Sequence, residues 1–139
     1  MDRTLRLLGA VLVLANGAIH LARWFDGYEN IPTIGELFLV NAAAAVVIAV
    51  ALVARPSRLV EGAAVAFSIG TLTALAVATA DMLFQFTEST GDAYVLAAVV
   101  VEAAAVVVIG FALARRLLAD GVTARLGGLR GRVDMNAAR

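Results

Sequence analysis

The sequence predicts an all-α integral membrane protein, a four-helix transmembrane bundle, and three observations support this. Hydrophobic residues make up 62% of the 139 residues and charged residues only 16%, whereas an ordinary soluble domain has ~45–50% and ~25%. Four separate apolar stretches are each long enough to cross a bilayer core of ~30 Å. Most arginines flank the same end of these stretches. So little polar surface excludes a soluble globular fold, and so much apolar sequence excludes disorder.

The four predicted spans follow one another with short polar connections. The spans cover residues 5–22, 34–54, 59–84 and 93–114. The connections contain Gly, Pro, Asn or Ser and are typical of loops and turns at residues 24–33, 55–58 and 85–92. Short connections make consecutive helices antiparallel, which predicts an up-down-up-down bundle. The third span is longer than a bilayer needs, so we expect it to tilt or to project from the membrane.

Several helix starts carry capping signals. Thr33 is followed three residues later by Glu36, which is the pattern of a capping box at the start of the second span. Thr4, Ser57 and Asp92 stand where they can cap the first, third and fourth spans. We therefore expect side-chain oxygens to accept hydrogen bonds from the first backbone N–H groups of each helix.

Arginine placement predicts the orientation. Arg23 lies at the end of the predicted bundle where the first span leads into the second. The opposite end, which includes the N-terminus, is flanked by Arg3, Arg6, Arg55, Arg58, Arg115 and Arg116. The positive-inside rule then puts both termini in the cytoplasm. All eleven basic residues are arginine and none is lysine. This bias is typical of a high-GC bacterial genome, so we expect a bacterial plasma membrane. Arg3 and Arg6 precede an apolar run as in a signal peptide, but no convincing cleavage site follows, so we expect the run to remain as a span.

The chain divides into a four-span domain, residues 1–116, and a basic tail, residues 117–139. The tail is rich in Gly and Arg, so we expect it to be interfacial or disordered and held near anionic lipid headgroups. The alternative is a docking segment for a cytoplasmic partner, supported only by charge.

Composition also excludes some kinds of chemistry. Cysteine is absent, which excludes disulfides, cysteine-bound zinc and thiol relays. The net charge is zero and gives no indication of nucleic-acid binding. We therefore expect the lipid bilayer as a partner and no nucleic acid.

Polar residues inside the spans are the candidate functional residues, because ionisable groups are costly in a membrane. The candidates share the outer half of the bundle and are His20, Glu102, Asp81, Glu36, Asn16 and Asn41. Asn16, His20 and Arg23 share one helical face through i, i+4, i+7 spacing. This asymmetry predicts a polar pocket that opens to the outer side, above an inner half sealed by Ala, Val and Leu.

Each candidate also has a structural interpretation. Glu36 can be a helix cap, and Asp81 can be hydrated at a helix end. Asn16 and Asn41 can form hydrogen bonds between helices. His20 can be a neutral imidazole that is hydrogen-bonded within the bundle. Arg23 can extend to the interface or pair with Asp26. Glu102 is the hardest to explain structurally, because a carboxylate near the midplane must be protonated or paired, with His20 or Arg23 as candidates.

Three kinds of site chemistry were considered from these residues. His20, Glu102 and Asp81 offer N and O ligands for a divalent metal, but no helical pair with ligand spacing supports this. A haem would need Met82 as its second axial ligand. A Ser68–His20–Asp81 triad is disfavoured because Ser68 and His20 lie at different depths. The sequence does not identify a cofactor.

Small residues are expected to mediate helix packing, as is usual in lipid. The third span has the clearest stripe, formed by Gly62, Ala66, Gly70, Ala74 and Ala78. The second span offers Ala42, Ala45 and Ala49. One of these stripes is alternatively the interface of a homo-oligomer.

The sequence resembles a group of uncharacterised small four-helix membrane proteins of actinobacteria. The similar segments are GAIHLARWFDGY, IPTIGELFLVNAAAAVVIAVAL, DMLFQFTE and VVVEAAAVV. The resemblance implies recurring residues at His20, Ile31 to Phe38, Glu88 and Glu102, and covers most of residues 5–114. More distantly, the layout and the opening RLLGAVLVLANG are similar to the DoxX-like family, which implies a link to quinone or thiosulfate redox physiology, although fold does not carry function.

Three functions remain as hypotheses. The first is a non-enzymatic binding or accessory protein, whose pocket takes a small molecule, lipid headgroup or cation from the outer side. The second is a structural subunit, in a homo-oligomer or with a membrane protein partner. The third is a DoxX-like membrane redox protein.

Overall fold

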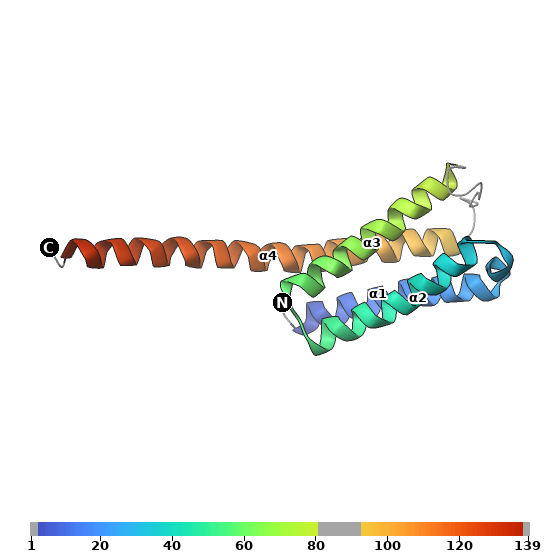
Figure 1. The fold of residues 1–139 in the computed structure, drawn as a ribbon, viewed down its shortest axis with the longest axis horizontal. Coiled ribbons are helices and arrows are strands. Elements are labelled where there is room, and N and C mark those ends of the chain that lie inside the picture. Colours follow the sequence, from blue (N-terminus) through green and yellow to red (C-terminus); the bar gives the residue numbers. More distant parts are fainter. Residues whose placement is uncertain (1–2, 81–92, 138–139) are drawn as a thin grey trace.

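A computed structural model describes the backbone of residues 3–80 and 93–137, and the side chains as far as residue 123. These residues are helical apart from short connections. The elements are α1 (Arg3–Phe25), the 3₁₀-helix η1 (Tyr28–Asn30), α2 (Ile34–Ala54), α3 (Arg58–Thr79) and α4 (Ala93–Ala137) (Figure 1). All four α-helices are long and apolar enough to span a membrane. The prediction of an all-α protein with four membrane-spanning helices is confirmed.

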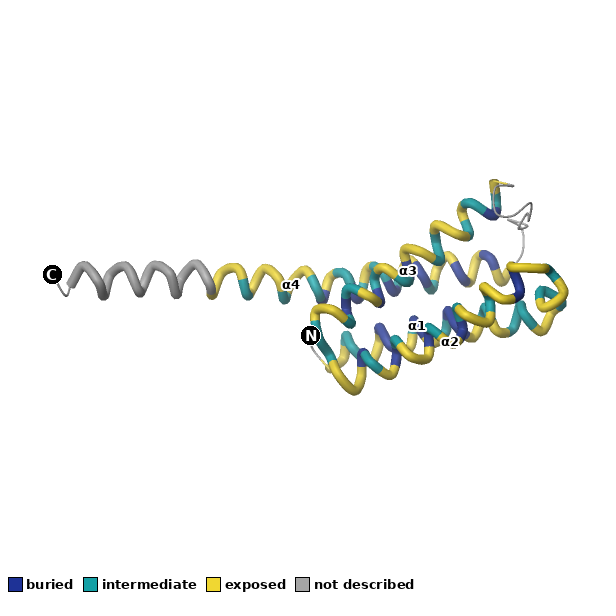
Figure 2. Tube along the Cα trace, in the orientation of Figure 1, coloured by how far each residue is buried: buried dark blue, intermediate teal, exposed yellow. Residues whose placement is uncertain are grey.

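The helices form a bundle that is open on one side. In Figure 1, α1 and α2 lie side by side, α4 packs against α1 and α3, and α3 diverges from α2 towards its C-terminal end. We call the end with Arg3, Arg6 and Arg55 the arginine end and the end with η1 the loop end. Buried positions follow the seams between helices, as Figure 2 shows, and most of α3 remains intermediate or exposed.

The closest helix contact is between α1 and α2. A Cβ added to Gly17 would lie 2.6 Å from the Cβ of Ala45, so only glycine fits there. Ala42, Ala45 and Ala49 are all buried, as expected of a small-residue face. Backbones that approach this closely maximise dispersion contacts, which replace the hydrophobic effect between helices in lipid.

The small-residue stripe of α3 does not pack in this way. A Cβ added at Gly62 or Gly70 would meet no atom within 4 Å. Ala66 and Ala74 are exposed, although Ala78 is buried. The expectation that this stripe mediates close helix packing is therefore wrong at Gly62 and Gly70, because the divergence of α3 leaves open space beside them.

The helix caps follow the sequence in one case and depart from it in another. The Ser57 hydroxyl accepts a 3.2 Å hydrogen bond from the Val60 N–H, which confirms the predicted cap of α3. Thr33 makes no side-chain cap bond and has a φ of 66°, so the predicted capping box is wrong. Backbone carbonyls take its place, since the Gly35 N–H donates to the Ile31 carbonyl at 2.9 Å. Thr4 lies within α1, and Asp92 is outside the described residues.

Helix α4 is longer than predicted. It continues to Ala137 instead of ending near residue 114, and Figure 1 shows it extending beyond the other helices. The chain after residue 114 contains no proline and many Ala, Leu and Arg residues, which are good helix formers. The basic tail therefore continues α4 as far as Ala137.

Candidate functional site

A cavity of about 350 Å³ lies between the four helices towards the loop end. Most of its lining is apolar and includes Ile19, Leu37, Phe38, Phe67, Leu75 and Val95. The α3 positions Ala66, Gly70, Ala74 and Ala78 form one wall, so the small-residue stripe lines a space. The polar lining residues are His20, Arg23, Asn41, Thr71, Tyr94 and Glu102. Apolar walls with a few polar groups are typical of small-molecule sites.

Four of these residues, His20, Asn41, Thr71 and Glu102, line the same cavity because they lie at similar depths on different helices. His20 is five residues before the end of α1, and Asn41 is seven residues after the start of α2. Thr71 is eight residues before the end of α3, and Glu102 is nine residues after the start of α4. At ~1.5 Å per residue these positions lie ~8–14 Å from the loop end of each helix. Three of the four, His20, Asn41 and Glu102, are candidates that the sequence analysis placed in the same half of the bundle.

His20 is held in a fixed orientation on the α1 wall. Its Nδ1 lies 3.0 Å from the backbone carbonyl oxygen of Asn16. Its ring packs against Phe38 of α2 at 4.9 Å between centroids. A carbonyl oxygen only accepts hydrogen bonds, so Nδ1 carries the hydrogen and donates it. In a neutral imidazole Nε2 is then an acceptor.

Arg23 and two tyrosines form the polar group nearest the loop end. The Arg23 guanidinium donates a hydrogen bond to the Tyr28 hydroxyl. Its central carbon lies 4.5 Å from the Tyr28 ring centroid and 5.2 Å from that of Tyr94. Such cation–π contacts stabilise a charge that is only partly hydrated. Two aromatic residues therefore hold Arg23 in place.

Glu102 is the most deeply placed charged residue of the cavity. It is only 1% exposed, and the Thr71 side chain lies within hydrogen-bonding reach of its carboxyl group. The Thr71 hydroxyl itself donates to the Ser68 carbonyl at 3.0 Å. The second carboxyl oxygen, Oε2, is buried without a hydrogen-bond partner among the described residues. The neighbour of Glu102 is thus Thr71, which the sequence analysis did not consider as a partner.

The two asparagines are also incompletely satisfied. Asn41 lines the cavity and its Oδ1 is buried with no described partner. Asn16 is 1% exposed, and neither its Oδ1 nor its Nδ2 has a described partner. A buried polar atom without a partner costs about 1–3 kcal/mol. Of the two, only Asn41 lies beside the cavity, where a ligand can add a hydrogen bond.

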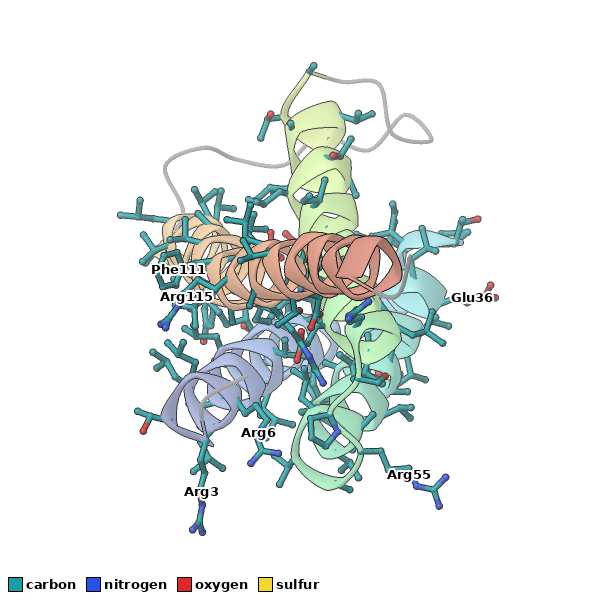
Figure 3. The ribbon with its side chains drawn as sticks, turned by 90° about the vertical axis from the view of Figure 1, so that its left-hand side faces the viewer. Arg3, Arg6, Glu36, Arg55, Phe111 and Arg115 are labelled. Carbon is teal, nitrogen blue, oxygen red and sulfur yellow. The ribbon has the colours of Figure 1, made fainter. Side chains whose placement is uncertain are left out.

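The remaining candidates do not line the described cavity. Glu36 is exposed and points away from the bundle in Figure 3. Asp81 lies outside the described residues, as does Met82. Among the residues that the structure describes, no three His, Asp or Glu side chains gather closely enough to hold a metal ion. Ser68 donates to the Ala64 carbonyl at 3.1 Å and does not line the cavity.

The half of the bundle below the cavity combines an apolar core with a buried carboxylate. A core of Ala, Val, Leu and Ile side chains does close it, including Val13, Leu52 and Ile109. Beyond that core, however, Glu61 is fully buried and accepts a 2.9 Å hydrogen bond from Arg116. Glu61 is thus a buried carboxylate in this half that the sequence analysis did not single out. A carboxylate within an apolar span, at the end where Arg115 and Arg116 occur, was the available signal.

The exposed lining residues show where the cavity opens. Leu37 of α2 and Gly70 and Ala74 of α3 are exposed although they line it. They stand on the two helices that diverge in Figure 1. The cavity thus opens sideways between α2 and α3, and Tyr94, also exposed, lies at its loop end. Comparison of the chain with protein-family models, with curated proteins and with solved structures finds no match.

Proposed function

We propose that this chain is a multi-pass protein of a bacterial plasma membrane that binds a small molecule as a non-enzymatic binding or accessory protein. The arginine end faces the cytoplasm, in accordance with the positive-inside rule. The loop end, with η1 and the cavity, then lies in the outer half of the membrane. The resemblance to small four-helix membrane proteins of actinobacteria agrees with this placement and assigns no activity.

The observation that carries this proposal is the cavity itself. It has about 350 Å³ of space, apolar walls from four helices and polar side chains at one level. Helices in lipid gain stability by packing closely, so a wall of small residues with empty space beside it is costly unless something fills the space. An amphipathic small molecule that enters between α2 and α3, or from the outer side, supplies the missing contacts.

Native mass spectrometry of the protein, extracted gently from its own membrane, tests this function. The wild-type protein should carry an added mass, and Gly70→Leu should abolish it by filling the cavity. Gly62→Leu is the matched control. Gly62 lies on the same helix with nothing within 4 Å of an added Cβ, yet it does not line the cavity. The added mass should persist in that variant.

Three results would overturn the proposal. A bare polypeptide in every preparation would favour a structural subunit, and so would a stable complex with a second membrane protein. An added mass that survives Gly70→Leu would show that the retained molecule lies elsewhere, for example on the lipid-facing surface.

A further inference from the structure

The cavity has an excess of hydrogen-bond acceptors in its interior. Oε2 of Glu102 and Oδ1 of Asn41 are both buried without described partners, and both residues line the cavity. His20 adds a third acceptor, because its Nδ1 donates to the Asn16 carbonyl and leaves Nε2 of a neutral ring as an acceptor. These three groups belong to residues of α4, α2 and α1 that line the same cavity.

Two lining residues that carry hydrogen-bond donors, Thr71 and Arg23, are already engaged. The Thr71 hydroxyl has one hydrogen, which it donates to the Ser68 carbonyl. The Arg23 guanidinium bonds to Tyr28 and lies against two aromatic rings, three residues nearer the loop end than His20. A ligand that brings further acceptors, such as a quinone, leaves the three interior acceptors unmatched. A ligand that brings donors satisfies them.

The shape and charge of the site narrow the class of donor. The walls around the acceptors are aliphatic or aromatic, with Phe38 and Phe67 among them, so they suit an apolar body and also tolerate a cation next to it. A primary ammonium group has three N–H donors, one for each acceptor. Its positive charge also offsets the cost of a carboxylate in an apolar surrounding, where an unpaired charge is strongly disfavoured.

We propose that the cavity binds a compact primary ammonium ion. Its –NH₃⁺ group contacts the Glu102 carboxylate, Asn41 Oδ1 and His20 Nε2, and its apolar body lies along the α3 wall of Ala66, Gly70 and Ala74. This inference rests on the proposed function and specifies its ligand class. A bare metal ion fits less well, because hard cations need several oxygen ligands and these walls supply few.

Equilibrium binding to the full-length protein in lipid nanodiscs tests the inference. The probes are 1-aminoadamantane and 2-phenylethylamine, each compared with the alcohol of the same skeleton, 1-adamantanol and 2-phenylethanol. Both amines should bind at least tenfold more tightly than their alcohols, because a charge-assisted hydrogen bond is roughly twice as strong as a neutral one. Glu102→Gln should weaken amine binding at least tenfold and leave alcohol binding little changed.

The control variants separate the site from general charge effects. Glu36→Gln removes an exposed carboxylate at the same end of the bundle and should leave amine binding unchanged. Asn41→Leu removes one acceptor and should weaken amine binding severalfold, which keeps the test valid even where Glu102→Gln fails to fold.

The failures of the two proposals are distinguishable. Equal binding of amines and alcohols, or amine binding that is insensitive to both Glu102→Gln and Asn41→Leu, would overturn the ammonium inference. Lack of amine binding would do the same. In these cases the proposed function still stands if the wild-type protein retains a molecule that Gly70→Leu removes. If no such molecule is found, the proposed function and the ammonium inference both fail.

Discussion

Arg116 of α4 donates a hydrogen bond of 2.9 Å to Glu61 of α3, two residues separated by 55 positions in the sequence. The Glu61 side chain is fully buried, while that of Arg116 is 35% exposed. One turn further along α4, Asp120 pairs with Arg58 at the first position of α3. The start of α3 is therefore joined to α4 by two ion pairs, at the end of the bundle opposite the cavity.

Loss of the Arg116 partner should destabilise the bundle. Arg116→Gln leaves the buried Glu61 carboxylate with a weaker donor, so we expect a loss of about 1.5–3 kcal/mol in the free energy of unfolding. Unfolding by SDS titration, followed by circular dichroism, measures this. The double variant Glu61→Gln with Arg116→Gln should recover part of the loss, because no charge then remains buried. An additive double variant would contradict a direct interaction.

Close packing between α1 and α2 should make Gly17 sensitive to any side chain. A Cβ at this position would lie 2.6 Å from the Ala45 Cβ, so Gly17→Leu should cost about 1–3 kcal/mol or more by overpacking. Gly110→Leu is the control, since an added Cβ there meets nothing within 4 Å. Equal effects of the two substitutions in the same unfolding measurement would rule out the close approach.

The buried amide of Asn16 should lower stability in the isolated protein. Both of its polar side-chain atoms are buried without described partners, and leucine has the same number of non-hydrogen side-chain atoms. Asn16→Leu should therefore raise the free energy of unfolding by roughly 1–3 kcal/mol. A decrease would contradict this and indicate that the Asn16 amide is hydrogen-bonded in the folded protein.

The loop between α1 and α2 contains a strained backbone position. Thr33 has a φ of 66°, which a β-branched residue rarely adopts. Thr33→Gly should relieve this and raise stability by about 1 kcal/mol, whereas Thr33→Val should not, because valine keeps the branched Cβ. Thermal unfolding of the two variants in detergent compares them, and equal melting temperatures would contradict the strain.

The number of spans and their approximate limits could be predicted from the sequence. Residues 34–54 were predicted as a span and α2 is Ile34–Ala54, because a continuous apolar run has few alternatives to a helix in a membrane. The Ser57 cap was equally predictable, since a hydroxyl at that position satisfies local N–H groups. The candidates His20, Asn41 and Glu102 followed from the cost of polar groups inside spans.

Contacts between helices could not be predicted in the same way. The sequence shows which residues are small, but not which of them meet a partner. Gly17 is in tight contact with Ala45, while Gly70 lines an open space, although both are glycines within apolar helices. The difference arises from the divergence of α3, a property of how whole helices pack.

The sequence by itself thus determined the membrane-spanning class, the helices and the level at which the polar side chains lie, because these depend on hydropathy and on the fixed rise of a helix. Only the tertiary structure decided that Glu36 faces away from the bundle, that Glu61 is buried against Arg116, and that the cavity opens between α2 and α3. Those features depend on helix rotation and tilt, which are set by packing between distant segments and not by any local pattern.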